Sequence, residues 1–185
     1  MVKTLAVLLA LCAVAHADDD DGGDAPVDNG PPLLLGFRLA AGQLPVAHQD
    51  LTTFSIGLDV DHPVSRSWRM FGEYEWMWLD RDQMSTQHGN GHRLLAGLRH
   101  TLVQKRAGHF RAYLDVEGGG GLAVLDDSVL GVRIMPAGFA GLRGGYDFTH
   151  SDSPSRVFEI ELLVRAIMVD DGTGMLAGFG MQWGN

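Results

Sequence analysis

The sequence predicts an all-β fold: an eight-stranded antiparallel up-and-down transmembrane β-barrel with a polar interior. From residue 33 onward, eight segments of about ten to sixteen residues alternate apolar with polar or small residues, and turn-rich stretches separate them. The apolar face is large and aromatic, whereas the opposite face combines glycine with Arg, Asp and Glu. No stretch reaches the roughly 18 consecutive apolar residues of a membrane-spanning helix.

Residues 1–17 are typical of a secretory signal peptide. Lys3 gives a positive start, residues 5–14 form an apolar run, and Ala15-His16-Ala17 is a small-x-small cleavage site. We therefore expect export, with cleavage before Asp18. A lipid-anchored form is not expected, because Leu11 stands directly before Cys12 where a lipoprotein signal has Gly or Ala.

Residues 18–32 form an acidic leader, which we expect to be disordered and solvated, although weak cation chelation is an alternative. Loss of the signal removes one of the 14 basic residues and none of the 23 acidic ones. So acidic a chain has no electrostatic reason to bind nucleic acid. The mature chain also lacks cysteine, which fits a bacterial envelope protein better than a disulfide-stapled extracellular module.

In residues 33–185, the predicted barrel, each segment places its apolar residues on one face. In the first four segments these residues are Leu33, Leu35, Phe37, Leu39 and Ala41; Phe54, Ile56, Leu58 and Val60; Trp68, Met70, Tyr74, Trp76 and Trp78; and Leu94, Ala96, Leu98 and Leu102. In the last four they are Phe110, Ala112, Leu114, Val116, Leu122 and Val124; Val132, Ile134, Ala140, Leu142, Tyr146 and Phe148; Phe158, Ile160, Leu162, Val164 and Met168; and Met175, Ala177, Phe179, Met181 and Trp183. No helical period is found, so all eight are predicted strands.

The apolar face is predicted to face lipid. Bulky apolar residues on all eight strands would overfill so small a barrel, whereas glycine with scattered charges fits its interior. A membrane barrel must also close, and eight is the smallest strand number of bacterial single-chain barrels. A soluble lipocalin-like barrel of reversed polarity is the alternative.

Two sets of residues follow from this polarity. Because a buried charge is costly unless paired, the inward charges should form a salt-bridge network: Arg38, Glu73, Glu75, Arg93, Arg99, Arg111, Asp115, Glu117, Arg133, Arg143, Asp147, Glu159, Glu161 and Arg165. Aromatic residues near segment ends should form an interfacial girdle, unless they merely fill a core: Phe54, Trp68, Trp76, Trp78, Tyr146, Phe148 and Trp183.

Loop lengths suggest that both termini are periplasmic. The predicted outer loops lie near Gln43–Thr52, Asp80–Gly91, Leu125–Gly131 and Asp170–Thr173. The predicted periplasmic turns lie near His62–Ser67, Gln104–Gly108 and Thr149–Ser155.

By its pattern, its strand number and its aromatic-ended last segment, residues 175–183, the chain resembles the small eight-stranded outer-membrane barrels of Gram-negative bacteria, such as the transmembrane domain of outer membrane protein A, OmpX and OmpW. The resemblance covers residues 33–183. It implies location in the bacterial outer membrane, contact with outer-membrane lipid, and recognition of residues 175–183 by the barrel-insertion machinery. One departure is that Gly184 and Asn185 follow Trp183, where these barrels end on the aromatic residue.

We expect a monomeric, non-enzymatic barrel without metal or cofactor, with a structural role or an interaction through loops Gln43–Thr52 and Asp80–Gly91. A narrow channel lined by the inward charges is an alternative. Another is a lipid A-modifying enzyme, since outer-membrane lipid A deacylases, which the chain resembles only loosely, use a His, a Ser and a Glu, and His150 and Ser153 stand close together here with Glu159 and Glu161 downstream. His88 and His92, near Asp80 and Asp82, are the candidate zinc ligands, although their spacing is not specific.

Overall fold

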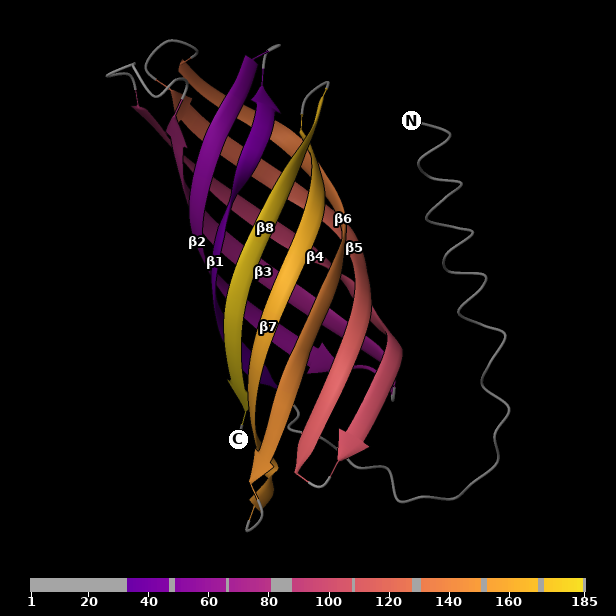
Figure 1. Cartoon of the computed structure of the whole chain (residues 1–185). Helices are drawn as coiled ribbons and strands as arrows, with labels where there is room; N and C mark the ends of the chain where they lie inside the picture. The colour runs from indigo at the N-terminus through magenta and orange to yellow at the C-terminus, as the bar shows by residue number, and fades with distance from the viewer. Residues whose placement is uncertain are drawn as a thin grey trace.

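A computed structural model describes residues 33–46, 49–65, 67–80, 88–107, 109–127, 131–150, 153–169 and 172–184. These residues form one closed barrel of eight antiparallel strands, so the predicted fold class is confirmed (Figure 1). The strands are β1 (Leu34–Val46), β2 (Gln49–Pro63), β3 (Trp68–Asp80), β4 (His88–Ala107), β5 (Phe110–Asp127), β6 (Gly131–His150), β7 (Ser153–Val169) and β8 (Gly172–Gly184). No helix within the described ranges is long and apolar enough to cross a membrane.

Closure comes from antiparallel pairing between the first and last strands. The β1–β8 ladder runs from Leu34 opposite Gly184 to Gln43 opposite Met175. Every other strand pairs with its two neighbours along the chain. A closed ladder leaves no strand edge with unpaired backbone groups, which is the condition for crossing a lipid bilayer with strands.

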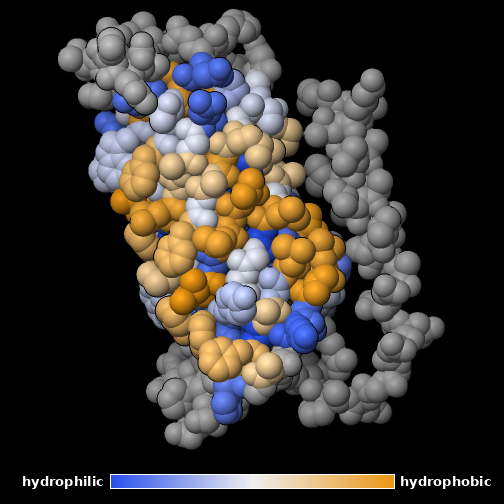
Figure 2. All heavy atoms as spheres, in the orientation of Figure 1, coloured by the Kyte–Doolittle hydropathy of each residue, from blue (hydrophilic) through white to orange (hydrophobic). Residues whose placement is uncertain are grey.

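Alternate residues point outward and inward on each strand. On β7, Leu162 is 66% exposed on the outer surface, whereas Leu163, the next residue, is 3% exposed inside the barrel. In Figure 2, apolar residues form a band across the middle of the visible face, and hydrophilic residues gather toward its two ends. This band is the surface expected of a wall that faces hydrocarbon.

The strands extend further than the sequence predicted. Leu44 on β1 lies opposite Leu51 on β2, and Val46 lies opposite Gln49. The prediction of an outer loop over Gln43–Thr52 is therefore wrong. Both leucines point inward and are buried, so the barrel wall continues through the stretch that was predicted as a loop.

The other predicted connections are shorter or partly outside the described residues. Strand β4 runs through the predicted turn at 104–108 as far as Ala107, and β6 and β7 occupy most of the predicted turn at 149–155. The predicted loops at 125–131 and 170–173 likewise lose residues to the adjoining strands. The loop at 80–91 narrows to residues 81–87, which lie outside the described residues, whereas the turn at 62–67 lies close to its predicted position.

A bulge at Leu102 changes the wall near the end of β4. Thr101 pairs with Asp115, and Val103 already pairs with Leu114, so Leu102 is the extra residue. Leu102 and Val103 are both exposed as a result. The end of the β4–β5 hairpin thus presents apolar residues on a part of the wall where simple alternation would have placed one of them inside.

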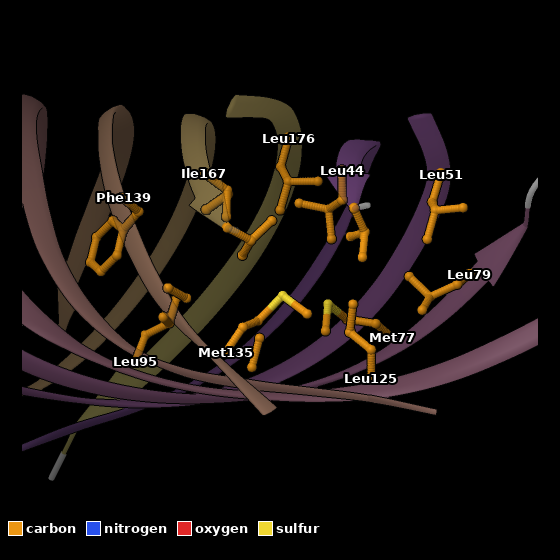
Figure 3. Close-up of a cluster of buried hydrophobic side chains, with 14 of the residues drawn as sticks. Leu44, Leu51, Met77, Leu79, Leu95, Leu125, Met135, Phe139, Ile167 and Leu176 are labelled. Carbon is orange, nitrogen blue, oxygen red and sulfur yellow. The ribbon is translucent and has the colours of Figure 1, made fainter. Parts of the chain in front are cut away.

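The interior contains a buried apolar layer toward the end of the barrel where β1 joins β2 and β3 joins β4 (Figure 3). Side chains from opposite walls point toward one another in this layer, and all eight strands contribute. The layer consists of Leu44, Val46, Leu51, Phe71, Met77, Leu79, Leu95, Ala123, Leu125, Met135, Ala137, Phe139, Ile167, Val169 and Leu176. The expectation that bulky apolar residues would not fit inside is therefore wrong for this part of the lumen.

Glycine makes room for the largest of these side chains. Phe139 is fully buried, and its ring centroid lies 5.6 Å from that of Phe71. A Cβ atom at Gly97 would lie 2.9 Å from Cζ of Phe139 and 2.5 Å from the carbonyl oxygen of Gly118. The absence of a side chain at Gly97 thus lets an aromatic ring fill the lumen.

Candidate functional site

The second part of the lumen is a layer of buried charges. It lies between the apolar layer and the end of the barrel where β1 begins and β8 ends. Its most deeply buried arginines are Arg38, Arg93, Arg99, Arg143 and Arg165, each at most 1% exposed. Its buried acids are Asp59, Asp61, Glu73, Glu75, Asp115, Glu117, Asp147, Glu159 and Glu161. All of these side chains occupy inward positions of the strand alternation, so the backbone itself brings them together.

Four arginines and four carboxylates of this layer form a closed ring in which positive and negative groups alternate. In order around the ring these are Arg38, Glu161, Arg143, Asp61, Arg99, Glu117, Arg165 and Glu73, which pairs with Arg38 again. Its contacts include Arg38 Nη2 to Glu161 Oε1 at 2.6 Å and Arg165 Nη1 to Glu73 Oε1 at 2.8 Å. The members come from β1 through β7, so the ring ties together seven of the eight strands.

The remaining strand joins through an amide. Gln182 on β8 donates a hydrogen bond from Nε2 to Asp59, and its Oε1 accepts one from Nη2 of Arg143 at 3.2 Å. Arg69 adds a contact from Nη1 to Glu159 at 3.2 Å, and Glu159 also pairs with Arg143. Each charge in this low-dielectric space therefore has a partner of opposite sign, which offsets the cost of taking it out of water.

Two ion pairs lie beside the ring. Glu75 pairs with Arg93, whose Nε donates to Oε2 at 2.6 Å, next to Met77 of the apolar layer. Arg111 pairs with Asp147 at the opposite side of the charged layer, and the Arg111 side chain is 28% exposed. The first pair is fully enclosed, whereas the second lies at the mouth of the lumen.

The charged and apolar layers meet through arginine–aromatic contacts. The guanidinium carbon of Arg99 lies 3.9 Å from the ring centroid of Phe71. That of Arg165 lies 4.9 Å from the centroid of Phe139. A guanidinium is attracted to the face of an aromatic ring, most strongly where water is excluded. The boundary between the layers is therefore packed by direct contact.

Most of the predicted lumen charges lie in this layer, and Arg133 does not. Arg133 is half-buried near the other end of the lumen, two residues before Met135 of the apolar layer and opposite Leu125. The predicted set also omitted Asp59, Asp61, Arg69 and Gln182. The sequence alternation already places these four on the polar face of their segments, so the signal for them is present in the sequence although the predicted network did not include them.

The predicted aromatic girdle residues lie near the two ends of the apolar band. On β2 and β3, Trp78 lies 5.5 Å from Phe54 and 4.4 Å from Trp76 between ring centroids. Toward the other end, the Phe148 centroid lies 5.1 Å from Phe110 and 6.1 Å from Phe158, two residues outside the predicted set. At this same end, Trp68 is half-buried, and Tyr146 and Trp183 are exposed.

The candidate catalytic and zinc-binding residues do not form a catalytic or metal site among the described side chains. The side chains of His150, Ser153 and His88 lie outside the described residues, as does Asp82. His92 faces outward, where its Nδ1 lies 2.7 Å from the hydroxyl of Tyr74. Among the described side chains, no group of three or more His, Cys, Asp or Glu could hold a metal ion.

Comparison with known proteins identifies structural neighbours. No protein-family model and no curated protein sequence matches the chain. Among solved structures, the barrel is similar to Neisserial surface protein A, with a TM-score of 0.55 and 11% identity over 82% of this chain and 96% of that one. Two others are Ail of Yersinia pestis (TM-score 0.44, 14% identity, 84% and 97% covered) and the N-terminal β-barrel domain of OprF from Pseudomonas aeruginosa (0.42, 15%, 81% and 96%). These neighbours are small eight-stranded outer-membrane barrels, and at this identity the likeness shows the fold alone.

Proposed function

We propose that the protein is a non-conducting, non-enzymatic barrel of the bacterial outer membrane that serves as a rigid support for the connections at its outer end. The observation that carries this proposal is the filled lumen. A closed ring of ion pairs and a layer of apolar side chains from all eight strands are stacked along the same narrow interior. The fold shared with outer-membrane barrels supports the location.

The stacking of the two layers opposes ion flow in two ways. An ion in the charged layer would have to separate guanidinium–carboxylate pairs that are almost fully buried. It would then meet the side chains of the apolar layer, beside which Thr53 and Ser55 of β2 are buried hydroxyls. Apolar constrictions block pores by excluding water. The alternative, a narrow channel along the inward charges, requires both layers to move aside.

Conductance across a planar bilayer tests this proposal. The purified full-length chain, inserted in a potassium chloride solution, is expected to show no unitary current steps. Insertion is checked separately, by the heat-dependent mobility of the same sample in SDS electrophoresis. Reproducible current steps whose ion selectivity changes in Arg99→Glu would overturn the proposal and establish the channel instead.

In a barrel that serves as a support, we expect the residues that determine binding specificity on the connection between β3 and β4. It spans residues 81–87 and is the longest of the connections between strands. Loops held on a rigid scaffold are where binding residues concentrate. An epitope tag inserted between residues 83 and 84 should be labelled on intact cells, whereas the same tag between residues 108 and 109 should be labelled only after the outer membrane is opened. The reverse pattern would place the wrong end of the barrel outside.

A further inference from the structure

Strand β6 begins beyond the part of the barrel in which every strand has two neighbours. On one side it pairs with β5 from Gly131, opposite Asp127, but on the other side its pairing with β7 begins only at Ala137, opposite Val169. Within the described ranges, residues 131–136 therefore have a strand neighbour on one side only. We call this stretch the β6 edge, and it lies at the upper end of the barrel in Figure 1.

The backbone of the β6 edge turns hydrogen-bonding groups toward its open side. Further along β6, a Cβ atom added at Gly141 would lie 2.6 Å from the carbonyl oxygen of Val164, so this carbonyl, opposite Leu142, faces β6. The even-numbered residues of β6 therefore bond to β7, and the odd-numbered ones bond to β5. Because neither ladder shifts register over this length, Val132 and Ile134 each direct an N–H and a C=O away from β5.

The β6 edge has little of the protection that strand edges usually carry, which consists of bulges, charged side chains or proline. The end of β4, which runs past the start of β3, has both the bulge at Leu102 and the exposed Lys105. The β6 edge has no bulge, and its outward side chains include Val132 and Ile134. Its one proline, Pro136, stands at the base of the edge, next to the first residue that pairs with β7.

Val132 and Ile134 also stand beyond the reach of lipid tails. They are 68% and 71% exposed, the highest values among the exposed large apolar side chains of the described residues. From Phe148, in the aromatic cluster toward the other end of the wall, 16 residues lead back along β6 to Val132. At roughly 3.3 Å per residue and a tilt of about 40°, this is about 40 Å of height. The apolar band of such barrels is only about 25 Å tall, so hydrocarbon does not cover these two side chains.

We infer that the β6 edge binds an extended peptide segment of another protein, which adds a strand beside β6 beyond the end of β7. Backbone hydrogen bonds to Val132 and Ile134 hold such a strand in a ladder, and its alternate side chains cover the exposed valine and isoleucine. Asp126 is exposed opposite Val132, so a segment that carries a basic residue fits best. The inference is separate from the role of the β3–β4 connection, and it holds whichever end of the barrel faces the cell exterior.

A second copy of the chain is the competing occupant of the β6 edge. Two barrels inserted the same way in one membrane are related by an axis along the membrane normal. Strands that each tilt by about 40° would then cross at about twice that angle where their edges meet, and strands so crossed do not form a ladder. A peptide outside the membrane is free to align with β6 and is therefore favoured.

A short synthetic peptide can serve as the probe. We choose the sequence KVTVTVK, labelled with fluorescein, because its valines alternate and its lysines suit Asp126. Fluorescence anisotropy measures its binding to the full chain folded in phosphatidylcholine vesicles, with protein-free vesicles as the blank. Saturable binding is expected. The same peptide with N-methyl groups on its valines and threonines should bind at least tenfold more weakly, because its inner nitrogens have no hydrogen to donate.

Two variants at Ile134 separate backbone recognition from side-chain contact. Ile134→Pro removes the N–H that points away from β5 and leaves the β5 ladder intact, so it should weaken binding about tenfold. Ile134→Thr keeps this N–H and should keep most of the affinity. Heat-dependent mobility in SDS shows that each variant has folded.

Three results would overturn the inference. The first is the absence of saturable binding, and the second is equal binding by the two peptides or by the two Ile134 variants. The third is a dimer, seen by sedimentation of the protein in detergent, that Ile134→Pro dissociates, because a second copy would then occupy the β6 edge.

Discussion

Arg165 and Phe139 meet at the boundary between the two layers of the lumen, with the guanidinium carbon 4.9 Å from the ring centroid. The same arginine donates from Nη1 to Glu73 at 2.8 Å and from Nε to Glu117. One side chain therefore belongs to the ion-pair ring and packs on the apolar layer. The two layers are consequently expected to respond together when either is disturbed.

Gly97 should be intolerant of even a methyl group. Its added Cβ would press on Phe139 and on the carbonyl of Gly118, and overpacking of this kind costs about 1–3 kcal/mol. Gly97→Ala should therefore lower the free energy of unfolding by about that amount, measured by urea titration in lipid vesicles with tryptophan fluorescence. Gly72→Ala is the matched control, because a Cβ there meets nothing within 4 Å on the outer surface. Equal stabilities of the two variants would contradict the packing described for Phe139.

Glu75 and Arg93 should behave as a coupled pair. Arg93→Met alone leaves Glu75 charged and buried, which typically costs about 3–5 kcal/mol. Replacing Glu75 by Leu in the same chain removes that uncompensated charge, so the double variant should recover most of the lost stability. A double-mutant cycle of unfolding free energies measures the coupling. Additive losses would show that the two side chains do not depend on each other.

The fold class could be predicted from the sequence because the alternation of apolar and polar residues also indicates which face of each strand points out of the barrel. Leu58 and Asp59, for example, differ so strongly in polarity that only one assignment of inside and outside suits a bilayer. The buried apolar layer could not be predicted in this way, because no contrast in polarity marks its residues as inward-facing. Met77 stands between Trp76 and Trp78, so both faces of that stretch are apolar and the pattern does not say that one faces the lumen.

The ion-pair ring was predictable as a set of inward charges but not as a ring. Which arginine meets which carboxylate depends on the stagger between strands, and this stagger fixes partners such as Arg38 and Glu161, 123 residues apart. The strand ends were missed for a related reason. Pro45 and the polar residues around it are typical of a loop, and only the pairing of Leu44 with Leu51 shows that the wall continues.

A folded barrel should resist SDS until it is heated. Hydrogen-bond ladders close around the whole molecule, so detergent finds no strand edge from which to begin unfolding. Outer membranes of a Gram-negative host that expresses the full chain with its signal should give two mobilities for the protein, one unboiled and one boiled. A soluble periplasmic protein with a single mobility would contradict the membrane barrel.

Two variants, each with one cysteine at one of two adjacent positions of β7, test most directly whether the wall is apolar outside and the lumen is filled. Cys12 is the one cysteine of the sequence, so Leu162→Cys and Leu163→Cys, each made in a chain that starts at Asp18, carry a single thiol. In vesicles, a lipid-soluble maleimide should label Leu162→Cys, at the 66% exposed position, and should label Leu163→Cys only after unfolding, because that position is 3% exposed inside the barrel. Labelling of Leu163→Cys in the folded state, with Leu162→Cys protected from the lipid-soluble reagent, would mean that the barrel is inside out.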